Sequence, residues 1–256
     1  MILYFSGVGN TRLVARQLAA LCNDRCQAIE ASTPPLTAFC REDETLVLCF
    51  PVYAWGPPLL VEEYLKRSQT EVIQTKPKRL YMVCTCGDDI GMTDVFVNKL
   101  LKPYGRCADA VFSVQMRNTY VSLPGFDVDD DALVRRKLQH AATRLPSIIE
   151  AIRQRLHQAY DVYPGAYPWF KSCILRPLFN RFLVTDRFFR TTEACTRCGA
   201  CAAACPVDNI HLQSDGPRWK GSCTGCLACY HRCPTRAVRF GRTTEHKGQY
   251  LYSRTE

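Results

Sequence analysis

The sequence ILYFSGVGNT, residues 2–11, decides the fold of the N-terminal half of this chain. Its first four residues are apolar and suit a buried strand, and the glycine-rich turn at residues 6–9 leads directly into a helical pattern that begins near Thr11. Glycines let backbone N–H groups surround a phosphate, and a helix N-terminus adds partial positive charge. The stretch therefore predicts a phosphate-binding loop, although an ordinary strand-to-helix turn has a similar composition.

Apolar runs and helical patterns alternate after this stretch. Strands are expected near residues 2–5, 27–31, 45–50, 79–84 and 108–114, with helices near 11–21, 58–66 and 93–104. Strands that are apolar throughout suit a parallel sheet buried on both faces. We therefore expect an α/β fold with a doubly wound parallel five-stranded sheet. A further helix is expected from about Asp129, kinked or divided at Pro146.

The 16 cysteines fall into a scattered set and two dense blocks. The start of the chain lacks the basic flank and cleavage site of a signal peptide, and no apolar run reaches the roughly 18 residues of a membrane span. We therefore expect a cytoplasmic protein without a membrane span, whose cysteines serve metal or redox chemistry rather than disulfides. The scattered cysteines are Cys22, Cys26, Cys40, Cys49, Cys84, Cys86, Cys107 and Cys173.

Both dense blocks have the spacing CxxCxxCxxxCP, and they cover residues 195–206 and 223–234. Three closely spaced thiolates in a tight loop can bind three iron corners of a cubane, whereas the fourth corner must be reached from elsewhere. Zinc is the alternative because it is also bound by paired CxxC ligands, but it rarely uses three evenly spaced cysteines plus a fourth. His231, inside the second block, is expected to be an exposed loop residue rather than a ligand.

Over about 45 residues the doubled motif, with its two prolines, resembles the two-cluster bacterial ferredoxins. The resemblance implies a small α+β two-cluster ferredoxin-like domain with two 4Fe-4S clusters, in which the fourth cysteine of each run ligates the cluster of the other run. The implied ligands are Cys195, Cys198, Cys201 and Cys233 for cluster 1, and Cys223, Cys226, Cys229 and Cys205 for cluster 2.

The loop at residues 6–11 resembles the phosphate loop of flavodoxins, which implies FMN as a cofactor and the strand order 2-1-3-4-5. Flavodoxins usually carry a hydroxyl residue where this chain has Val8, so weaker binding of FMN is expected. The loops after the third and fourth strands fall where flavodoxins contact the isoalloxazine ring. The candidate FMN-binding residues are Ser6, Gly7, Val8, Gly9, Asn10, Thr11, Val52, Tyr53, Ala54, Trp55, Gly56, Thr85, Cys86, Gly87 and Asp88.

Several of these candidates have a second interpretation. Tyr53 and Trp55 can stack on a flavin or pack between domains. Asn118 and Tyr120 are further candidates to face the flavin, although polar loop residues are commonly only solvated. The pair Cys84 and Cys86 suggests a redox-active thiol, but buried thiols are more common at the end of a strand. Asp88 and Asp89 are alternatively caps of the next helix.

Four segments are expected along the chain. They are a flavodoxin-like FMN-binding domain (1–158), an aromatic and basic connector (159–190), a ferredoxin domain with two 4Fe-4S clusters (191–242) and a C-terminal tail (243–256). The aromatic residues of the connector are expected to dock the two domains together. Because basic residues interleave with them, a helix lying on a membrane surface is the alternative.

The whole net charge of +9 belongs to the C-terminal part. Residues 1–150 contain 17 Lys and Arg against 17 Asp and Glu, whereas residues 151–256 contain 16 against 7. Two oxidised clusters with four thiolates each would offset about four positive charges. The remaining basic surface predicts redox partner proteins with an acidic docking face, and no nucleic-acid partner.

Over nearly its whole length the chain resembles the fused flavodoxin–ferredoxin proteins of anaerobic bacteria and archaea. The resemblance implies an iron–sulfur flavoprotein that carries electrons between two 4Fe-4S clusters and FMN in anaerobic redox metabolism. One alternative is a flavin-dependent reductase of a small molecule, which predicts a roomy pocket beside Tyr53, Trp55 and Tyr120. Another is a colourless zinc- and nucleic-acid-binding module. No catalytic residue is assigned, since no pattern of a general acid, base or nucleophile stands out.

Overall fold

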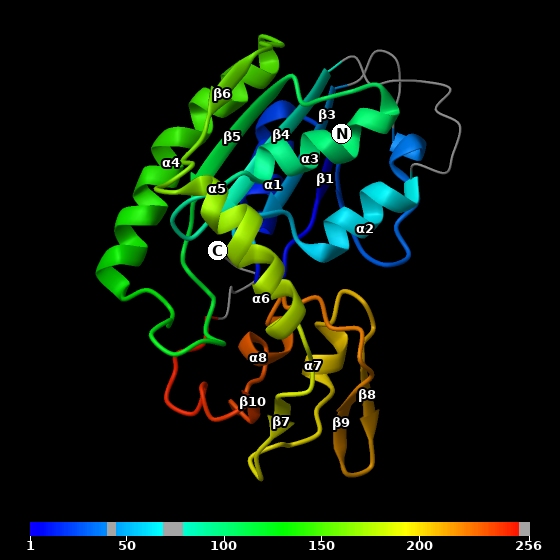
Figure 1. The fold of residues 1–256 in the computed structure, drawn as a ribbon, viewed down its shortest axis with the longest axis vertical. Coiled ribbons are helices and arrows are strands. Elements are labelled where there is room, and N and C mark those ends of the chain that lie inside the picture. The colour runs from blue at the N-terminus through cyan, green and yellow to red at the C-terminus, as the bar shows by residue number, and fades with distance from the viewer. Residues whose placement is uncertain (40–44, 69–78, 251–256) are drawn as a thin grey trace.

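The computed structural model describes residues 1–39, 45–68 and 79–250. Figure 1 shows an upper α/β part, a lower cysteine-rich part, and a helical segment that runs between them. Cys40 and residues 251–256 of the expected tail lie outside the described residues. Within the described ranges, no helix combines the length and the apolar composition that crossing a membrane requires.

The upper part contains a six-stranded sheet in the order β2-β1-β3-β4-β5-β6, in which every neighbouring pair is parallel. This confirms the predicted order 2-1-3-4-5 of the flavodoxin-like fold. The strands are β1 (Ile2–Tyr4), β2 (Cys26–Ala28), β3 (Thr45–Pro51), β4 (Arg79–Cys86), β5 (Ala110–Gln115) and β6 (Ala159–Asp161).

The sixth strand corrects the expectation of a five-stranded sheet. Strand β6 pairs with β5 in the register Ala110↔Ala159, inside the segment that was expected to be a connector. It is an edge strand of three residues, and Tyr160 is 53% exposed. A strand this short, without an apolar run, leaves no periodic signal in the sequence.

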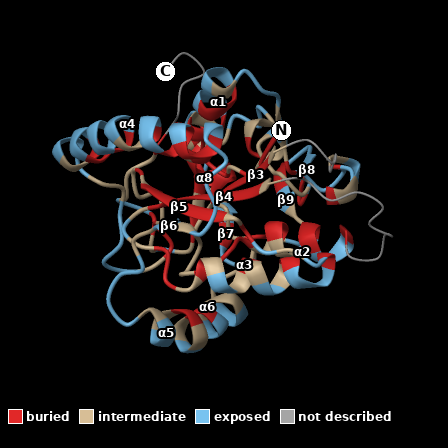
Figure 2. Cartoon of the chain, turned by 90° about the horizontal axis from the view of Figure 1, so that it is seen from above, coloured by how far each residue is buried: buried red, intermediate tan, exposed pale blue. Residues whose placement is uncertain are grey.

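Helices cover both faces of the sheet, which explains why its strands are apolar throughout. In β3, Leu46, Leu48 and Phe50 contribute to the core on one face, whereas Val47 and Cys49 contribute to the core on the other. Figure 2 shows the buried strands between the two layers of helices. The helices are α1 (Asn10–Cys22) and α4 (Asp131–Arg153) on one face, and α2 (Leu59–Ser68) and α3 (Thr93–Leu101) on the other, with 3-10 turns at η1 (Leu36–Phe39) and η2 (Lys102–Tyr104).

The helix was expected to be kinked or divided at Pro146, but α4 runs through this residue without interruption, so it is not divided there. Asp130 begins the helix, and its side chain accepts a hydrogen bond from the backbone N–H of Leu133 at 2.8 Å. Leu145 and Ile148, on either side of the proline, are both buried against the sheet. Packing on both sides therefore maintains the helix where proline removes a backbone donor.

The cysteine-rich part consists of two small β units and two short helices around a third core. Strands β7 and β10 pair antiparallel, as do β8 and β9. Val121 is fully buried in the same core, although it belongs to the loop after β5 of the upper part. The two parts therefore share apolar packing. The elements are β7 (Phe189–Thr191), α7 (Ala200–Ala203), β8 (Ile210–Gln213), β9 (Gly216–Trp219), α8 (Ala228–His231) and β10 (Val238–Phe240).

A continuous helical segment connects the two parts. It consists of α5 (Pro168–Phe170), a π-helical turn η3 (Lys171–Leu175) and α6 (Arg176–Phe182). Phe179 contacts Tyr120, with 5.5 Å between the ring centroids, as expected for a docking aromatic. Tyr167, Trp169 and Phe182 are 80%, 60% and 60% exposed, so the expectation that they dock the domains is wrong. The polar residues of this segment make most of the contacts described below.

Candidate functional site

A cavity of about 730 Å³ lies at the carboxyl ends of β1, β3, β4 and β5. This is the crevice in which open α/β sheets bind their ligands. Its lining is mainly apolar and includes every predicted FMN-binding residue except Gly9 and Gly56. The predicted residues that line it are Ser6, Gly7, Val8, Asn10, Thr11, Val52, Tyr53, Ala54, Trp55, Thr85, Cys86, Gly87 and Asp88, and the further candidates Asn118 and Tyr120 line it as well.

The phosphate loop is shaped by its own hydrogen bonds. Gly9 lies at the N-cap of α1 with φ 112°, a left-handed conformation that glycine adopts without strain, and its N–H donates to Ser6 Oγ at 3.1 Å. The buried hydroxyl of Thr11 pairs with that of Thr85 at 2.7 Å, and both residues line the cavity. Asn10 Oδ1 is buried and has no hydrogen-bond partner among the described residues. An unpartnered buried oxygen beside a helix N-terminus is compatible with a bound polar group.

The loop after β3 is a strained tight turn. Tyr53 and Gly56 exchange backbone hydrogen bonds of 2.9 and 3.2 Å, and between them Ala54 and Trp55 have φ values of 47° and 57°. Left-handed conformations are unfavourable for residues with a side chain and persist only where the surroundings enforce them. This turn therefore holds Trp55 at the cavity wall by means of contacts outside the turn.

The helical segment supplies those contacts. Arg176, only 4% exposed, donates to the carbonyls of Tyr53 and Pro57 at 2.9 and 2.7 Å and forms an ion pair with Glu62. Ser172 Oγ donates to the Trp55 carbonyl at 2.8 Å. A Cβ at Gly56 would overlap the Arg176 guanidinium, so glycine is required there for packing and not for contact with a ligand.

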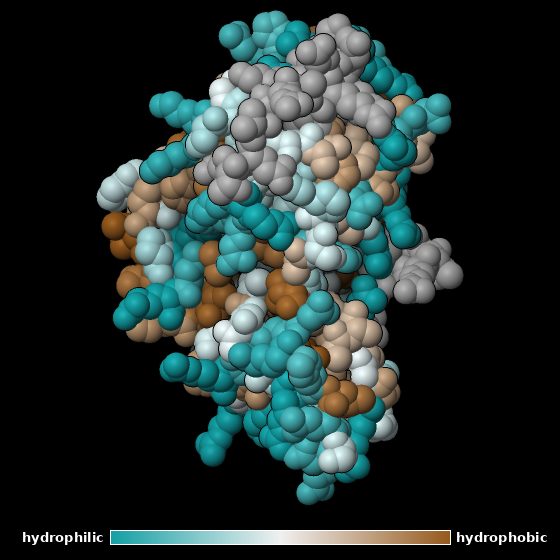
Figure 3. Space-filling model, turned by 90° about the vertical axis from the view of Figure 1, so that its right-hand side faces the viewer, coloured by the Kyte–Doolittle hydropathy of each residue, from teal (hydrophilic) through white to brown (hydrophobic). Residues whose placement is uncertain are grey.

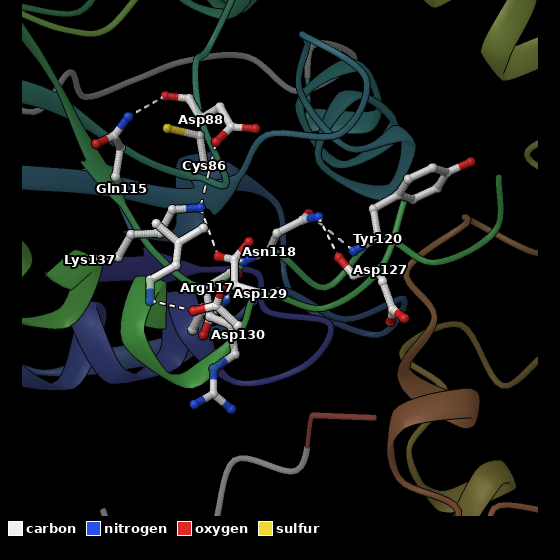
Figure 4. A network of polar contacts seen from close by, with 12 residues as sticks. Cys86, Asp88, Gln115, Arg117, Asn118, Tyr120, Asp127, Asp129, Asp130 and Lys137 are labelled. Carbon is white, nitrogen blue, oxygen red and sulfur yellow. Dashed lines mark hydrogen bonds and ion pairs between the residues drawn. The ribbon is translucent and has the colours of Figure 1, made fainter. Parts of the chain in front are cut away.

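Figure 4 shows how a buried lysine joins the loops after β4 and β5. Lys137 of α4 forms ion pairs with Asp129 at 2.7 Å and with Asp88 at 3.5 Å. Asp129 also accepts a hydrogen bond from the backbone N–H of Asn118 at 2.9 Å. A Cβ at Gly87 would lie 3.3 Å from Asn118 Oδ1, so the two loops approach each other closely. One cation therefore fixes both loops at the mouth of the cavity.

The thiols at the end of β4 are buried. Burial raises the pKa of Cys86 to about 12, and the nearby carboxylates of Asp89 and Asp88 act in the same direction. Burial likewise raises the pKa of Cys84 well above its ordinary value. Both side chains are therefore protonated at neutral pH, which disfavours the interpretation of this pair as a redox-active thiolate.

The predicted ligands of cluster 1 surround one small cavity. Cys195, Cys198, Cys201 and Cys233 all line it, although Cys233 belongs to the second block. Among the described residues, no group of three or more His, Cys, Asp and Glu side chains is placed to hold a single metal ion. Four thiols arranged around a cavity are what the four iron corners of a cubane require.

The predicted ligands of cluster 2 also lie together. Burial, together with the neighbouring thiols of Cys226 and Cys205, raises the pKa of Cys223 to about 12. Cys205 acts in the same way on Cys226 and Cys229. The fourth cysteine of the first block is therefore placed among the first three of the second. Each block thus contributes its last cysteine to the other set.

The cluster 2 cysteines adjoin the large cavity. Residues 224–227 form part of its wall, and Tyr53 and Cys226 pack beside the same core. Gly7 of the phosphate loop lies between them, because a Cβ there would be 2.6 Å from the Tyr53 hydroxyl and 2.9 Å from the Cys226 carbonyl. The phosphate loop and the cluster 2 loop are therefore in direct contact.

The structure corrects the expectation for His231, which is fully buried and not exposed. Its Nδ1 accepts a hydrogen bond from the backbone N–H of Tyr250 at 3.0 Å, and Nε2 lies 2.8 Å from the Thr119 carbonyl. Because Nδ1 accepts, Nε2 carries the proton and donates. Burial lowers the pKa of His231 to about 4, so the ring is neutral near pH 7. The side chain connects three segments and is not needed as a ligand.

Several cavity residues could not be found from the sequence. Most of them belong to the helical segment, to the loop after β5 and to residues 224–227, which reach the cavity only through tertiary packing. For the helical segment the sequence offered one signal of buried contacts, namely the polar residues at positions 171, 172 and 176 within an otherwise apolar helix. The additional lining residues include Asp89, Met116, Arg117, Thr119, Leu123, Phe126, Lys171, Leu175, Arg176, Leu178, Phe179, Phe182, Leu183, Thr224, Gly225, Cys226 and Leu227.

Comparison with known families identifies the cysteine-rich part. Residues 194–238 match the model of the family described as a 4Fe-4S dicluster domain. This range contains both cysteine blocks. No curated protein matches the chain.

Solved structures similar to the chain cover its α/β part at low identity. The Trp repressor binding protein from Bacillus subtilis is 13% identical over 56% of this chain and 95% of its own, with a TM-score of 0.39. A WrbA-like flavodoxin from Agrobacterium tumefaciens is 16% identical over 58% and 95%, with a TM-score of 0.36. The rubredoxin oxygen:oxidoreductase from Desulfovibrio gigas is 15% identical over 59% of this chain, with a TM-score of 0.33, and this chain spans only 35% of its length. The flavodoxin-like assignment follows from the strand order itself.

Proposed function

We propose that this chain is an iron–sulfur flavoprotein that carries electrons between two 4Fe-4S clusters and FMN. The observation that carries the proposal is the contact of Cys226 with the phosphate loop at Gly7. It brings one of the two cysteine sets against the cavity in which flavodoxin-like folds bind a ligand. When bound, the clusters exchange single electrons and FMN exchanges one or two.

The residues for holding FMN are present in the cavity. The backbone of residues 6–10 and the N-terminus of α1 are suited to the phosphate. Asn10 Oδ1 accepts only, so it suits a hydroxyl of the ribityl chain and not the phosphate. Tyr53 and Trp55 offer aromatic surface to the ring. The absence of a hydroxyl at Val8 removes one donor, so we expect moderate affinity for FMN.

The cysteines of cluster 1 and those of cluster 2 have different surroundings. From this difference we infer which cluster exchanges electrons with FMN and which with partner proteins. Cys226 lines the large cavity, whereas Cys198 is exposed. Backbone N–H groups donate to cysteine sulfurs in both sets, including Asn209 to Cys205 and Ala237 to Cys233, each at 3.2 Å. Such hydrogen bonds adjust reduction potentials. Cluster 1 is therefore the site of exchange with partners, and cluster 2 is the site of exchange with FMN.

Anaerobic purification tests the proposal. Two cubane clusters require about eight iron and about eight labile sulfides per chain, together with one flavin. Stopped-flow mixing with reduced methyl viologen should reduce the flavin rapidly in the parent protein. Cys223→Ala should retain FMN but slow its reduction at least tenfold.

Cys107→Ala is the matched control, because Cys107 is exposed and lies outside both cysteine blocks. It should reduce its flavin at the parental rate. A colourless protein without labile sulfide would contradict the proposal, as would a Cys223→Ala variant whose flavin is reduced as fast as in the parent.

A flavin-dependent reductase is the second candidate, favoured by the size of the cavity. The cavity extends beyond the predicted flavin loops to Phe126, Leu178 and Phe179, which leaves apolar space for a small acceptor. Direct steady-state reduction of a quinone or nitroaromatic compound by the purified protein would support this candidate. Turnover only in the presence of a protein acceptor would favour the carrier.

A further inference from the structure

Asn209 connects the two cysteine blocks at the ligands of cluster 2. This residue is only 1% exposed. Its backbone N–H donates to Cys205 Sγ at 3.2 Å, and its Oδ1 accepts hydrogen bonds from the backbone N–H groups of Lys220 and Ser222 at 3.2 and 2.7 Å. Ser222 immediately precedes Cys223 in the sequence. Asn209 therefore fixes the last cysteine of the first block to the start of the second block.

The side-chain amide of Asn209 also donates to a carboxylate from outside both blocks. Asp186 Oδ2 accepts this hydrogen bond at 2.9 Å, and it accepts a second one from the backbone N–H of Gly221 at 2.6 Å. Figure 1 shows the segment between α6 and β7, which contains Asp186, entering the cysteine-rich part. Val184 of the same segment lies against Gly225, where an added Cβ would meet the valine side chain at 3.4 Å. The segment therefore contacts the cluster 2 loop on both sides of its first cysteine.

The corresponding position at cluster 1 lacks the amide side chain that binds Asp186. Asn209 follows Cys205 by four residues, and Ala237 follows Cys233 by four residues. The backbone N–H of each donates to the sulfur of that cysteine at 3.2 Å, so the two positions are equivalent in the repeated pattern. An alanine side chain cannot donate a hydrogen bond to an acidic residue. The pattern therefore recruits a carboxylate through this position only at cluster 2.

The charge of Asp186 is not neutralised by a cation. Both of its hydrogen-bond donors are uncharged, and none of the ion pairs within residues 1–39, 45–68 and 79–250 includes it. A single residue separates the carboxylate from the Cys205 sulfur, which limits the distance between them to about 11 Å. At an effective dielectric constant of about 20, a unit charge at that distance changes a one-electron equilibrium by about tenfold.

We propose that Asp186 lowers the reduction potential of cluster 2 and leaves that of cluster 1 little changed. Reduction adds one negative charge to a cluster, and a fixed carboxylate disfavours that charge where it lies close. The electron of a singly reduced module is thereby biased toward cluster 1. This inference rests on the proposed function only in requiring two clusters with the ligands given above, and it does not depend on FMN.

A redox titration of the anaerobically purified full chain, followed by electron paramagnetic resonance, tests the role of Asp186. Asp186→Asn preserves the shape of the side chain and an oxygen for both hydrogen bonds, but it removes the charge. The potential of cluster 2 should rise by about 59 mV, which corresponds to a tenfold change in the ratio of reduced to oxidised cluster. Asp186→Glu keeps the charge but changes the length of the side chain, and it should retain the parental potential. Cys198→Ser, at a cluster 1 ligand, should alter the other potential and so identifies it as that of cluster 1.

Asp208→Asn is the matched control, because Asp208 carries the same charge one residue before Asn209 but is exposed. Water screens an exposed charge, so both potentials should stay close to those of the parent. Unchanged potentials in Asp186→Asn, loss of its iron, a shift of the cluster 1 potential, or an equal shift in Asp208→Asn or Asp186→Glu would each overturn the inference. These outcomes leave two reducible clusters in the parent, whereas a parent without labile sulfide would contradict the proposed function itself.

Discussion

Gly7 is the residue at which the α/β part meets the cysteine-rich part. Alanine there would place its Cβ 2.6 Å from the Tyr53 hydroxyl and 2.9 Å from the Cys226 carbonyl, and the carbonyl belongs to the backbone and cannot rotate away. We expect Gly7→Ala to weaken FMN binding at least tenfold, which corresponds to about 1.4 kcal/mol, in a fluorescence titration. Ser147→Ala, on the exposed side of α4 and away from the cavity, should bind FMN like the parent. Equal affinities for the parent and Gly7→Ala would contradict the observed contact.

His231 makes the contact between the loop after β5 and Tyr250 sensitive to acid. Its folded pKa of about 4 lies below the ordinary value of 6.5, so the unfolded state binds more protons between these values. The stability that the neutral ring contributes, at most about 3 kcal/mol, is full above pH 6.5 and is lost as the pH falls toward 4.

We therefore expect hydrogen exchange of the Tyr250 amide, corrected for its intrinsic rate, to be faster at pH 5 than at pH 7.5. In His231→Gln, which has no titrating ring, the corrected rate should not change between these pH values. A pH-independent rate in the parent would show that the ring does not control this contact.

At the residue scale, the positions that belong to a local sequence motif could be predicted. The phosphate loop and the eight cysteines have spacings set by local chemistry, and the structure places them around the cavities described. The environment of His231 could not be predicted, because its burial depends on two segments that are distant in sequence. The pairing of the Thr11 hydroxyl with Thr85 could not be predicted for the same reason.

The loops that follow β4 and β5 act together because Lys137 of α4 lies between them. Lys137→Met would leave Asp129, whose side chain is 10% exposed, as a buried carboxylate without its cation. We expect a decrease of about 3 kcal/mol in the free energy of unfolding, measured by urea denaturation, and weaker FMN binding. The double variant Lys137→Met with Asp129→Leu should recover part of the stability. No recovery would contradict the assignment of the loss to the unpaired charge.

Pro146 removes a backbone donor in the interior of α4, and its side chain is exposed. Alanine restores that donor without loss of packing. We expect Pro146→Ala to raise the free energy of unfolding by about 1–3 kcal/mol in urea denaturation. Ser147→Ala, at the neighbouring exposed position, is the control and should change it by less. A destabilised Pro146→Ala variant would indicate that the helix depends on the proline.

At the element scale, long periodic segments could be predicted and short ones could not. Strands β3, β4 and β5 and helices α1 to α4 have clear patterns in the sequence. Strand β6 has three residues, and its pairing depends on Arg144, which bonds to the carbonyls of Ser113 and Asp161 at 2.7 Å. The orientation of α5 and α6 could not be predicted, because the polar residues Ser172 and Arg176 are buried whereas Trp169 and Phe170 are exposed.

In the whole molecule, the excess of basic residues and the exposed Cys198 of cluster 1 lie in the same part. Arg197 and Arg236 are exposed beside the cluster 1 cysteines. On the side shown in Figure 3, the surface of the lower part is largely hydrophilic, and apolar groups gather at mid-height. We propose that this surface docks an acidic carrier, which long-range electrostatics would attract.

We expect Arg197→Glu combined with Arg236→Glu to slow electron transfer from an acidic ferredoxin about tenfold at low ionic strength. The difference should disappear at high salt, because salt screens surface charges. Arg135→Glu with Arg136→Glu, on the exposed side of α4, makes the same change in net charge away from the cysteines and should have little effect. Equal rates for the two double variants would contradict docking at cluster 1.

At the scale of the whole molecule, the sequence predicted two parts but not how they are joined. Cysteine spacing and strand pattern are local properties and indicate each part separately. The shared packing of Val121 and the contact of Gly7 with Cys226 arise only once both parts are folded. The size of the common cavity could therefore not be anticipated.

The attachment of the loop after β5 has a consequence for how the protein matures in the cell. Lys247 donates to the Val121 carbonyl at 2.8 Å, the Gly248 amide donates to Asp127 at 2.9 Å, and the Tyr250 amide donates to His231. A ribosome makes these residues after both cysteine blocks, so the part of the cavity wall formed by the loop after β5 cannot be held in place until the cysteine-rich part has been synthesised. Iron starvation should thus yield newly made protein that is poor in flavin even where riboflavin is plentiful.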